Sequence, residues 1–464
     1  MPAVANLRLW VVLWPMKRLL LSLLIGLTVV ISTSACDSQL AQGVRAAQAQ
    51  LLGHAGAFIR EGDQLAAAGR NSEAVLAYRQ ALEQDARNVQ ALQRLASAYA
   101  SQGRLRSARQ LLERALAIRP GDAEAARALA ALPTPAPGPL SLLWQTHVGD
   151  EVPAGIAPGD SVLYVALEDG RVQALTMDSG ALLWQARLAA PATSAPAIAG
   201  SLVLVGCRNG VLYSLSAADG SPRWSFTSGG PIYAAAASAG DLVYCASGDG
   251  TLYALALASG QVRWQVTTGA ALHEPPTVAN GVLYFGSSDG RIRALDAASG
   301  QARWQGGILT HGAVESRPTI VNGRVYVGSG DSRLYCLDAA TGGEYWHYST
   351  SDAIYASPLL EDGVVYVASS GNLLAALDAL SGEPVWKLRS RTALIYTPAL
   401  GQDAIYFVAQ GDPNLYAVDK GSGKLRWALD TGDWLASGPV IASGHLYLAG
   451  KDGTVLAYAL PTPQ

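Results

Sequence analysis

Short apolar runs separated by glycine-containing turns fill the chain from about residue 141 onward. Within these runs Val, Leu, Tyr and Phe alternate with small or polar residues, a period that indicates strands rather than helices. One clear example is VLYFGSSDGRIRALDAASGQARWQ, residues 282–305, in which two apolar runs and two turns are followed by a tryptophan. Each such unit predicts three strands joined by two turns.

A tryptophan closes each of these units. Successive tryptophans are 40 to 42 residues apart, and a glycine of the second turn lies four residues before most of them. A constant period of this length is typical of a β-propeller, with one unit in each blade. We expect the indole rings to pack between neighbouring blades. The predicted blade tryptophans are Trp144, Trp184, Trp224, Trp264, Trp304, Trp346, Trp386 and Trp427.

The first turn of most units contains Asp-Gly or Asn-Gly. These residues tolerate the positive φ that a two-residue hairpin requires. The sequence therefore predicts two-residue hairpins at 169–170, 209–210, 249–250, 289–290 and 452–453.

The two ends of the repeat region are each incomplete. The last hairpin ends at Leu460 without a further turn or tryptophan, whereas the segment around Trp144 has a tryptophan strand and no hairpin before it. Together they complete one blade and remove two exposed sheet edges. We therefore expect an all-β propeller over residues 141–464, with eight four-stranded blades and closure by its N-terminal and C-terminal strands.

Residues 39–132 are rich in Ala, Leu, Gln and Arg at helical spacing. A 34-residue repeat relates Gly69 to Gly103 and Ala74 to Ala108, and it resembles the tetratricopeptide repeat. It predicts a small all-α domain of about six helices, the outer two acting as caps. This domain is either a spacer or a groove for a peptide or partner. A proline-rich linker at 133–140 separates it from the strands.

The N-terminal region has the form of a secretory signal. Lys17 and Arg18 precede an apolar run, and small residues follow before Cys36. The arrangement is similar to a bacterial lipoprotein signal. It predicts removal of residues 1–35, or of a shorter segment if Met16 is the true start, and lipid on Cys36 within a 36–38 terminus. The alternative is an uncleaved anchor, which would be short for a membrane span.

Lipidation of Cys36 would hold the protein at a membrane, on its extracytoplasmic side. The sequence leaves open whether this is an inner membrane, an outer membrane or the surface of a cell with one membrane. Apart from Cys36, the chain has three cysteines, Cys207, Cys245 and Cys336. An odd number cannot form a complete disulfide set. Buried thiols are favoured, and a disulfide between the first two is the alternative.

Composition and charge exclude several classes of function. The net charge is −3 and Lys and Arg are not clustered, which argues against nucleic-acid binding. The sequence contains no nucleotide-binding loop, no Cys/His set with metal-ligand spacing and no common catalytic motif. We therefore expect a protein without enzymatic activity, cofactor or metal.

The repeat units GDGTLYALALASGQVRW and SDGRIRALDAASGQARW resemble the pyrroloquinoline-quinone-like propeller superfamily. That superfamily includes quinone-dependent alcohol dehydrogenases and BamB-type outer-membrane assembly lipoproteins. The dehydrogenases typically carry a vicinal Cys-Cys pair, and this chain has none, which leaves a degenerate quinoprotein as the weakest alternative. The resemblance implies a scaffold for envelope proteins, such as an outer-membrane barrel assembly complex, in which this chain is a monomer.

One ring of positions, three residues before a recurrent proline, is predicted to face the central funnel of the propeller. Tyr233, His273, Glu315 and Tyr355 occupy it in four consecutive blades, with Arg317 on the same strand face as Glu315. Two aromatic rings flanking a histidine and a glutamate are suited to a small polar ligand or a peptide side chain. The alternatives are a binding or sensing funnel and a solvated polar ring without a ligand.

Overall fold

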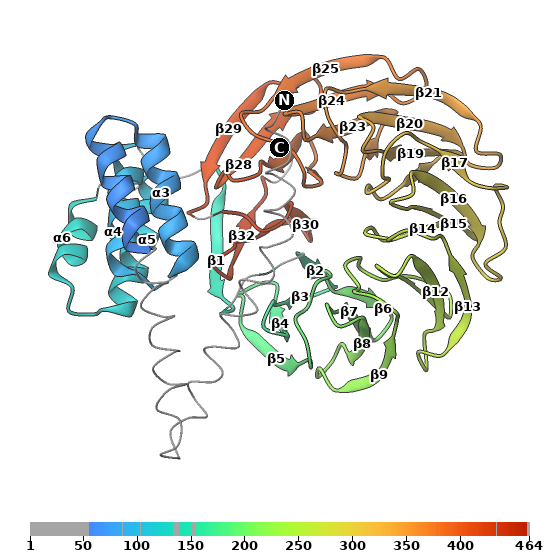
Figure 1. Cartoon of the computed structure of the whole chain (residues 1–464), viewed down its shortest axis with the longest axis horizontal. Coiled ribbons are helices and arrows are strands. Elements are labelled where there is room, and N and C mark those ends of the chain that lie inside the picture. Colours follow the sequence, from blue (N-terminus) through green and yellow to red (C-terminus); the bar gives the residue numbers. More distant parts are fainter. Residues whose placement is uncertain are drawn as a thin grey trace. The chain divides into compact units, whose positions relative to one another are not determined.

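The structure is a computed structural model. It describes residues 55–461 except 86, 103, 133–138, 150–151, 153–154 and 433. The chain divides into two compact units at residues 134 and 135, the first helical and the second built of strands (Figure 1). The predicted signal and Cys36 lie outside the described residues. No helix in the described part combines the length and hydropathy needed to cross a membrane.

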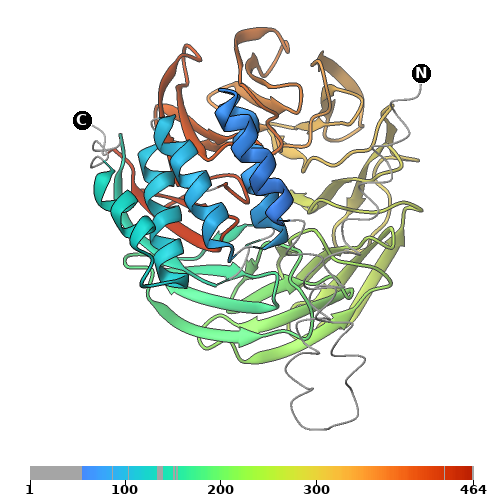
Figure 2. The ribbon, with the colours of Figure 1, turned by 60° about the vertical axis from the view of Figure 1, so that its left-hand side comes forward.

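The first unit contains five helices within the described residues. A helix at 55–67 is followed by α3 (Asn71–Gln84), α4 (Val89–Ser101), α5 (Leu105–Ile118) and α6 (Ala123–Ala131). Figure 2 shows them side by side. A sixth helix, if it precedes these, falls outside the described residues.

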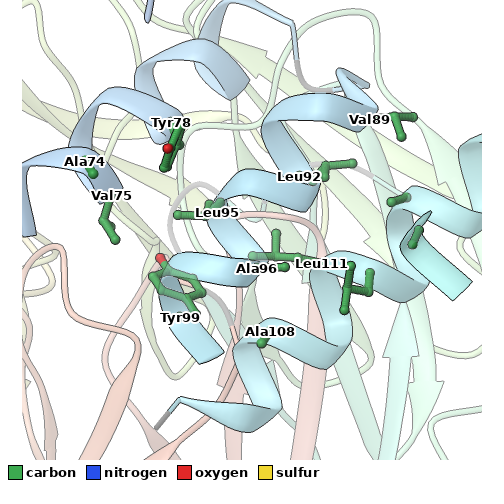
Figure 3. Packing of buried hydrophobic residues seen from close by; sticks show 13 residues of the cluster. Ala74, Val75, Tyr78, Val89, Leu92, Leu95, Ala96, Tyr99, Ala108 and Leu111 are labelled. Carbon is green, nitrogen blue, oxygen red and sulfur yellow. The ribbon is translucent and has the colours of Figure 1, made fainter. Parts of the chain in front are cut away.

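The helical core combines alanines with leucine, valine and tyrosine side chains. Ala96 and Tyr99 of α4 pack with Ala108 of α5 (Figure 3). The 55–67 helix approaches α3 closely at Gly62, where a Cβ would lie 2.4 Å from the Tyr78 ring. Close packing of these helices therefore depends on small residues at the contact as well as on hydrophobic ones.

The second unit is a ring of eight four-stranded antiparallel blades, as the sequence predicts. In blades 1 to 7 the strands follow chain order from the ring centre outward (Figure 1). Blades 1 to 4 comprise β2 (Ile156–Pro158), β3 (Val162–Ala166), β4 (Arg171–Thr176) and β5 (Leu182–Arg187); β6 (Ala197–Ala199), β7 (Leu202–Gly206), β8 (Val211–Ser216) and β9 (Pro222–Thr227); β10 (Ala237–Ala239), β11 (Leu242–Ala246), β12 (Thr251–Ala256) and β13 (Val262–Thr267); and β14 (Thr277–Ala279), β15 (Val282–Gly286), β16 (Arg291–Asp296) and β17 (Ile308–Leu309).

Blades 5 to 8 complete the ring. They comprise β18 (Thr319–Val321), β19 (Arg324–Gly328), β20 (Arg333–Asp338) and β21 (Glu344–Ser349); β22 (Leu359–Glu361), β23 (Val364–Ser369), β24 (Leu373–Asp378) and β25 (Pro384–Arg389); β26 (Ala399–Leu400), β27 (Ala404–Val408), β28 (Asn414–Asp419) and β29 (Leu425–Asp430); and β30 (Val440–Ala442), β31 (His445–Ala449) and β32 (Thr454–Ala459) with β1 (Ser141–His147).

Burial explains why the middle strands are almost continuously apolar. In β3 the last four of five residues are buried, because each blade packs against neighbours on both faces. In the outer strand β5 four of the six residues are exposed and none is fully buried. The core therefore lies in the seams between blades, and each seam is filled by the second and third strands.

The predicted closure is confirmed. β1 pairs antiparallel with β32, from Ser141 opposite Ala459 to His147 opposite Thr454. The outer strand of blade 8 thus comes from the start of the propeller and its three other strands from the end.

The tryptophans tie each blade to the next. Each indole Nε1 of the first seven donates a hydrogen bond to a backbone oxygen in the second turn of the following blade, as from Trp184 to Ala217 at 3.0 Å. The other pairs are Trp144 with Met177, Trp224 with Leu257, Trp264 with Ala297, Trp304 with Ala339, Trp346 with Ala379 and Trp386 with Lys420. Trp427 faces blade 8, where the chain does not turn back after β32, and its ring centroid lies 5.8 Å from that of Tyr406.

Two local expectations are wrong. All five predicted two-residue hairpins are three-residue loops. In blade 1 the Leu167 amide bonds to the Arg171 carbonyl, and only Gly170 of the loop adopts positive φ, at 84°. The same bond joins Cys207 to Val211, Ser247 to Thr251, Ser287 to Arg291 and Gly450 to Thr454, with positive φ at Gly210, Gly250, Gly290 and Gly453. Each is a type I turn with a glycine bulge rather than a two-residue turn. In blade 4, Trp304 precedes the outer strand instead of lying within it. Gly306 and Gly307 both adopt positive φ, so the outer strand β17 begins only at Ile308.

The contact between each tryptophan and the next blade's glycine predicts a selective effect of substitution. A Cβ at Gly220 would lie 2.5 Å from the Trp184 ring, whereas one at Gly240 would meet nothing within 4 Å. Both glycines have positive φ, so alanine costs backbone strain of about 1–2 kcal/mol at either site. We expect Gly220→Ala to lose roughly 1–3 kcal/mol more unfolding free energy than Gly240→Ala, measured by urea denaturation. Equal losses would contradict the seam contact.

Candidate functional site

The predicted funnel residues occupy equivalent places in four blades. Tyr233, His273, Glu315 and Tyr355 each lie four residues before the first strand of blades 3, 4, 5 and 6. The first strands border the centre of the ring (Figure 1). Tyr233 and Tyr355 expose 42% and 39% of their surface, so both rings are available for contact.

A cleft of about 680 Å³ brings three of these four residues together. Tyr233 is not among the lining residues, but its ring centroid lies 5.6 Å from that of His273. The cleft extends over blades 4 to 7, and its lining consists of His273, Glu274, Glu315, Asp352, Tyr355, Ser370, Ala393, Ile395 and Gln410.

Arg317 lies beside the cleft rather than in its lining. Its guanidinium Nε donates to Thr277 Oγ1 at 3.1 Å, and that hydroxyl donates to the Pro318 carbonyl at 2.6 Å. Arg317 of blade 5 is therefore anchored on the first strand of blade 4. From there its charge acts on Glu274.

Glu274 is the main residue that the sequence reasoning missed. Burial raises the pKa of its carboxyl to about 7, while the charge of Arg317 opposes this rise and the charge of Glu315 adds to it. Within the described residues, this carboxylate takes part in no hydrogen bond or ion pair, and Arg317 acts on it only through space. The carboxyl is thus held partly protonated near neutral pH.

The repeat itself marks Glu274 as unusual. Alignment of the blades places Ser194, Ala234, Ser316 and Ala356 at the same position, and all four are buried. The two serines each accept a hydrogen bond from a backbone amide at the end of the second strand, at 2.8 and 3.1 Å. Blade 7 has Tyr396 at this position, so a small side chain is common there but not universal. Glu274 is the only carboxylate at this position among the blades, and an alignment one residue past the ring would have revealed it.

The other unpredicted residues add polarity to the cleft. Ser370 donates to the Ala353 carbonyl at 2.9 Å, and Asp352 and Gln410 lie on connections outside the register of the ring. Burial raises the pKa of Tyr355, and the charges of Glu315 and Asp352 add to that rise. The lining includes three carboxylic acids and no lysine or arginine.

The cysteines do not contribute a redox site. Cys207, Cys245 and Cys336 are free and buried, so the alternative disulfide does not form. Burial raises the pKa of Cys207 and of Cys245 to about 12, with a smaller contribution from Asp249 at Cys245. Among the described residues, no three His, Cys, Asp or Glu side chains are grouped so that they could hold a metal ion.

The helical unit has a polar cleft of its own, of about 560 Å³. Gln93 of α4 donates to Asp122, the N-cap of α6, at 2.8 Å across it, and Arg94 pairs with Asp63 at 3.1 Å. The cleft carries both signs of charge. The choice between spacer and partner groove for this unit stays a prediction.

Sequence comparison assigns both units to known repeats. The family described as "Outer membrane protein assembly factor BamB" matches residues 141–235, 208–308, 306–399 and 381–462. The tetratricopeptide repeat family matches residues 65–132. No curated protein matches the chain significantly.

Solved structures share the propeller fold at low identity. BamB from Moraxella catarrhalis is 22% identical with a TM-score of 0.63, and the match covers 70% of this chain and 99% of that one. The computationally designed Ika8 protein is 16% identical with a TM-score of 0.62, covering 69% and 100%. Quinohemoprotein alcohol dehydrogenase from Comamonas testosteroni is 13% identical with a TM-score of 0.58, covering 70% and 78%.

The raised pKa of Glu274 predicts a specific pH dependence of stability. Because its folded pKa of about 7 exceeds the ordinary 4.5, the folded state binds more protons between these values and its stability falls as pH rises through them. From pH 5 to pH 8 we expect wild type to lose roughly 1–3 kcal/mol relative to Glu274→Gln. Urea denaturation at both pH values tests this, with Glu383→Gln in an exposed turn as the control. A constant difference between wild type and Glu274→Gln would refute it.

Proposed function

The chain belongs to the family of the outer membrane protein assembly factor BamB, and from this membership we propose a lipid-anchored interaction scaffold in the assembly of outer-membrane β-barrel proteins. The observation that carries the proposal is the match of that family over nearly the whole propeller, in four overlapping segments. Lipid on Cys36 would tether the scaffold to the membrane on its extracytoplasmic side. The protein acts there as a monomer within a complex.

Exposed leucines on two adjacent blades support a protein partner. Leu142 and Leu143 on β1 and Leu182 and Leu183 on β5 are each 43% to 56% exposed. Exposed apolar side chains on the outer strands of two adjacent blades are typical of an interaction surface. We call these four residues the leucine patch.

The residue just before the blade tryptophan differs between the leucine patch and several other blades. The residue before the blade tryptophan is Leu143 or Leu183 in the patch, whereas four other blades have arginine there: Arg223, Arg263, Arg303 and Arg426. The fold therefore tolerates a charge at this position. Leucine at this position in β1 and β5 therefore supports a role in binding rather than in folding.

We further propose that the protein binds and does not catalyse. Its buried, separated cysteines offer no vicinal pair, and the likeness to quinohemoprotein dehydrogenases is one of fold. We expect addition of pyrroloquinoline quinone and Ca²⁺ to leave the absorbance spectrum equal to the sum of the components. A shifted spectrum together with alcohol-dependent dye reduction would contradict this proposal.

A crosslinked pull-down from native membranes tests the scaffold. Tagged wild type is expected to recover an outer-membrane barrel protein with its assembly partners, and Cys36→Ser is expected to lose them. Leu143→Arg with Leu183→Arg should reduce recovery by roughly tenfold, because arginine at these positions removes apolar contact without disturbing the blade. Val385→Arg, at the matching exposed position of blade 6, is the control.

The outcomes separate the parts of the proposal. Recovery of a different envelope complex would retain the scaffold and refute barrel assembly. Recovery of no partner would refute both. Equal loss with Val385→Arg would refute the assignment to the leucine patch.

A further inference from the structure

The funnel cleft has the charge expected of a site for an organic cation. Glu274, Glu315 and Asp352 come from three consecutive blades, and neither lysine nor arginine is in the lining. These acids do not form a metal-binding group with each other or with His273 within the described residues. Carboxylates spread around a cleft are suited to a ligand that distributes its charge over several N–H donors, as guanidinium does.

Glu274 provides an independent indication of a ligand. It is a largely buried carboxylate that lines the cleft, at a repeat position where the neighbouring blades have buried serine or alanine. Burial of a carboxylate without a hydrogen-bond partner is unfavourable for folding. The fold would be better satisfied by a small residue, so the acid is suited to a partner that enters the cleft.

The nearest positive charge does not fulfil this role. Arg317 is held by Thr277 outside the lining, and the pKa of Glu274 stays raised in its presence. A guanidinium or ammonium group within the cleft would approach Glu274 and Glu315 together. Tyr355, which is 39% exposed, adds an aromatic face of the kind that cations contact.

We propose that the funnel cleft binds an arginine or lysine side chain presented by a polypeptide. The cleft, at about 680 Å³, is larger than one such side chain and leaves room for neighbouring backbone. Ser370 and Gln410 on the far side of the cleft offer polar groups to that backbone. This site is distinct from the leucine patch and does not depend on a role in barrel assembly.

Binding of the cation is coupled to ionisation of Glu274. A positive charge in the cleft favours the ionised carboxylate, so binding releases a proton and strengthens from pH 6 to pH 8. The other charged or titratable groups of the lining are His273, Glu315, Asp352 and Tyr355, and the charge of Arg317 acts on Glu274 from outside it. Glu274→Gln removes this coupling. The affinity of this variant for the cation should therefore change less between pH 6 and pH 8 than that of wild type.

Fluorescence anisotropy of the full protein with labelled Gly-Ser peptides tests the proposal. A peptide with a central arginine is expected to bind at least about tenfold more tightly than the same peptide with citrulline, which is similar in shape and uncharged. Glu274→Gln and Glu315→Gln should each weaken arginine binding by roughly tenfold, with Glu383→Gln as the exposed control. The arginine and citrulline comparison uses wild type and holds even if a variant fails to fold.

Each contrary result overturns a stated part of the proposal. Equal affinity for arginine and citrulline peptides would overturn cation recognition. Unchanged binding by folded Glu274→Gln, checked by circular dichroism, would overturn the role of the buried acid. Spermidine binding more tightly than the arginine peptide would assign the cleft to a free polyamine instead of a polypeptide. A pull-down that fails while the peptide binds would refute the assembly role alone.

Discussion

The propeller depends on the pairing of β1 with β32. These strands come from opposite ends of the repeat region, and their register runs from Ser141 opposite Ala459 to His147 opposite Thr454. The pairing completes blade 8 and brings its tryptophan, Trp144, against blade 1 through the bond to the Met177 carbonyl. Without it both edges of the ring would expose unpaired backbone groups. The cleft over blades 4 to 7 can keep its shape because the ring around it is closed.

The same tryptophan–glycine contact recurs between successive blades and holds the ring together. Seven of the eight seams place an indole beside a glycine that has no room for a Cβ, as Trp184 does at Gly220. Repetition of this contact leaves the outer strands and the funnel connections free to vary. Leu143, Leu183 and Glu274 each differ from the residues that several other blades have at the same repeat position. Binding functions are expected at such positions.

Periodicity made the architecture predictable, and departures from periodicity limited the prediction of the site. Blade number, strand order and closure follow from the recurrence of tryptophan and from the two incomplete ends of the repeat. Hairpin geometry did not follow, because Asp-Gly is compatible both with a two-residue turn and with the three-residue loop observed at Gly170. Glu274 was missed since its significance arises from burial, which depends on neighbours in blade 5. Asp352 and Gln410 reach the cleft from connections whose paths no pattern fixes.

Blade 8, which combines strands from both ends of the propeller, is the last blade that can form during synthesis. β1 is synthesised before every other strand of the propeller, yet its hydrogen-bonding partner β32 is the last. The contacts that shut the ring therefore have the largest sequence separation in the domain, and their formation is slow. Until the final blade emerges, the nascent chain carries an open edge to which other chains could add. Synthesis is thus the stage at which this protein is most exposed to aggregation and most in need of chaperone protection.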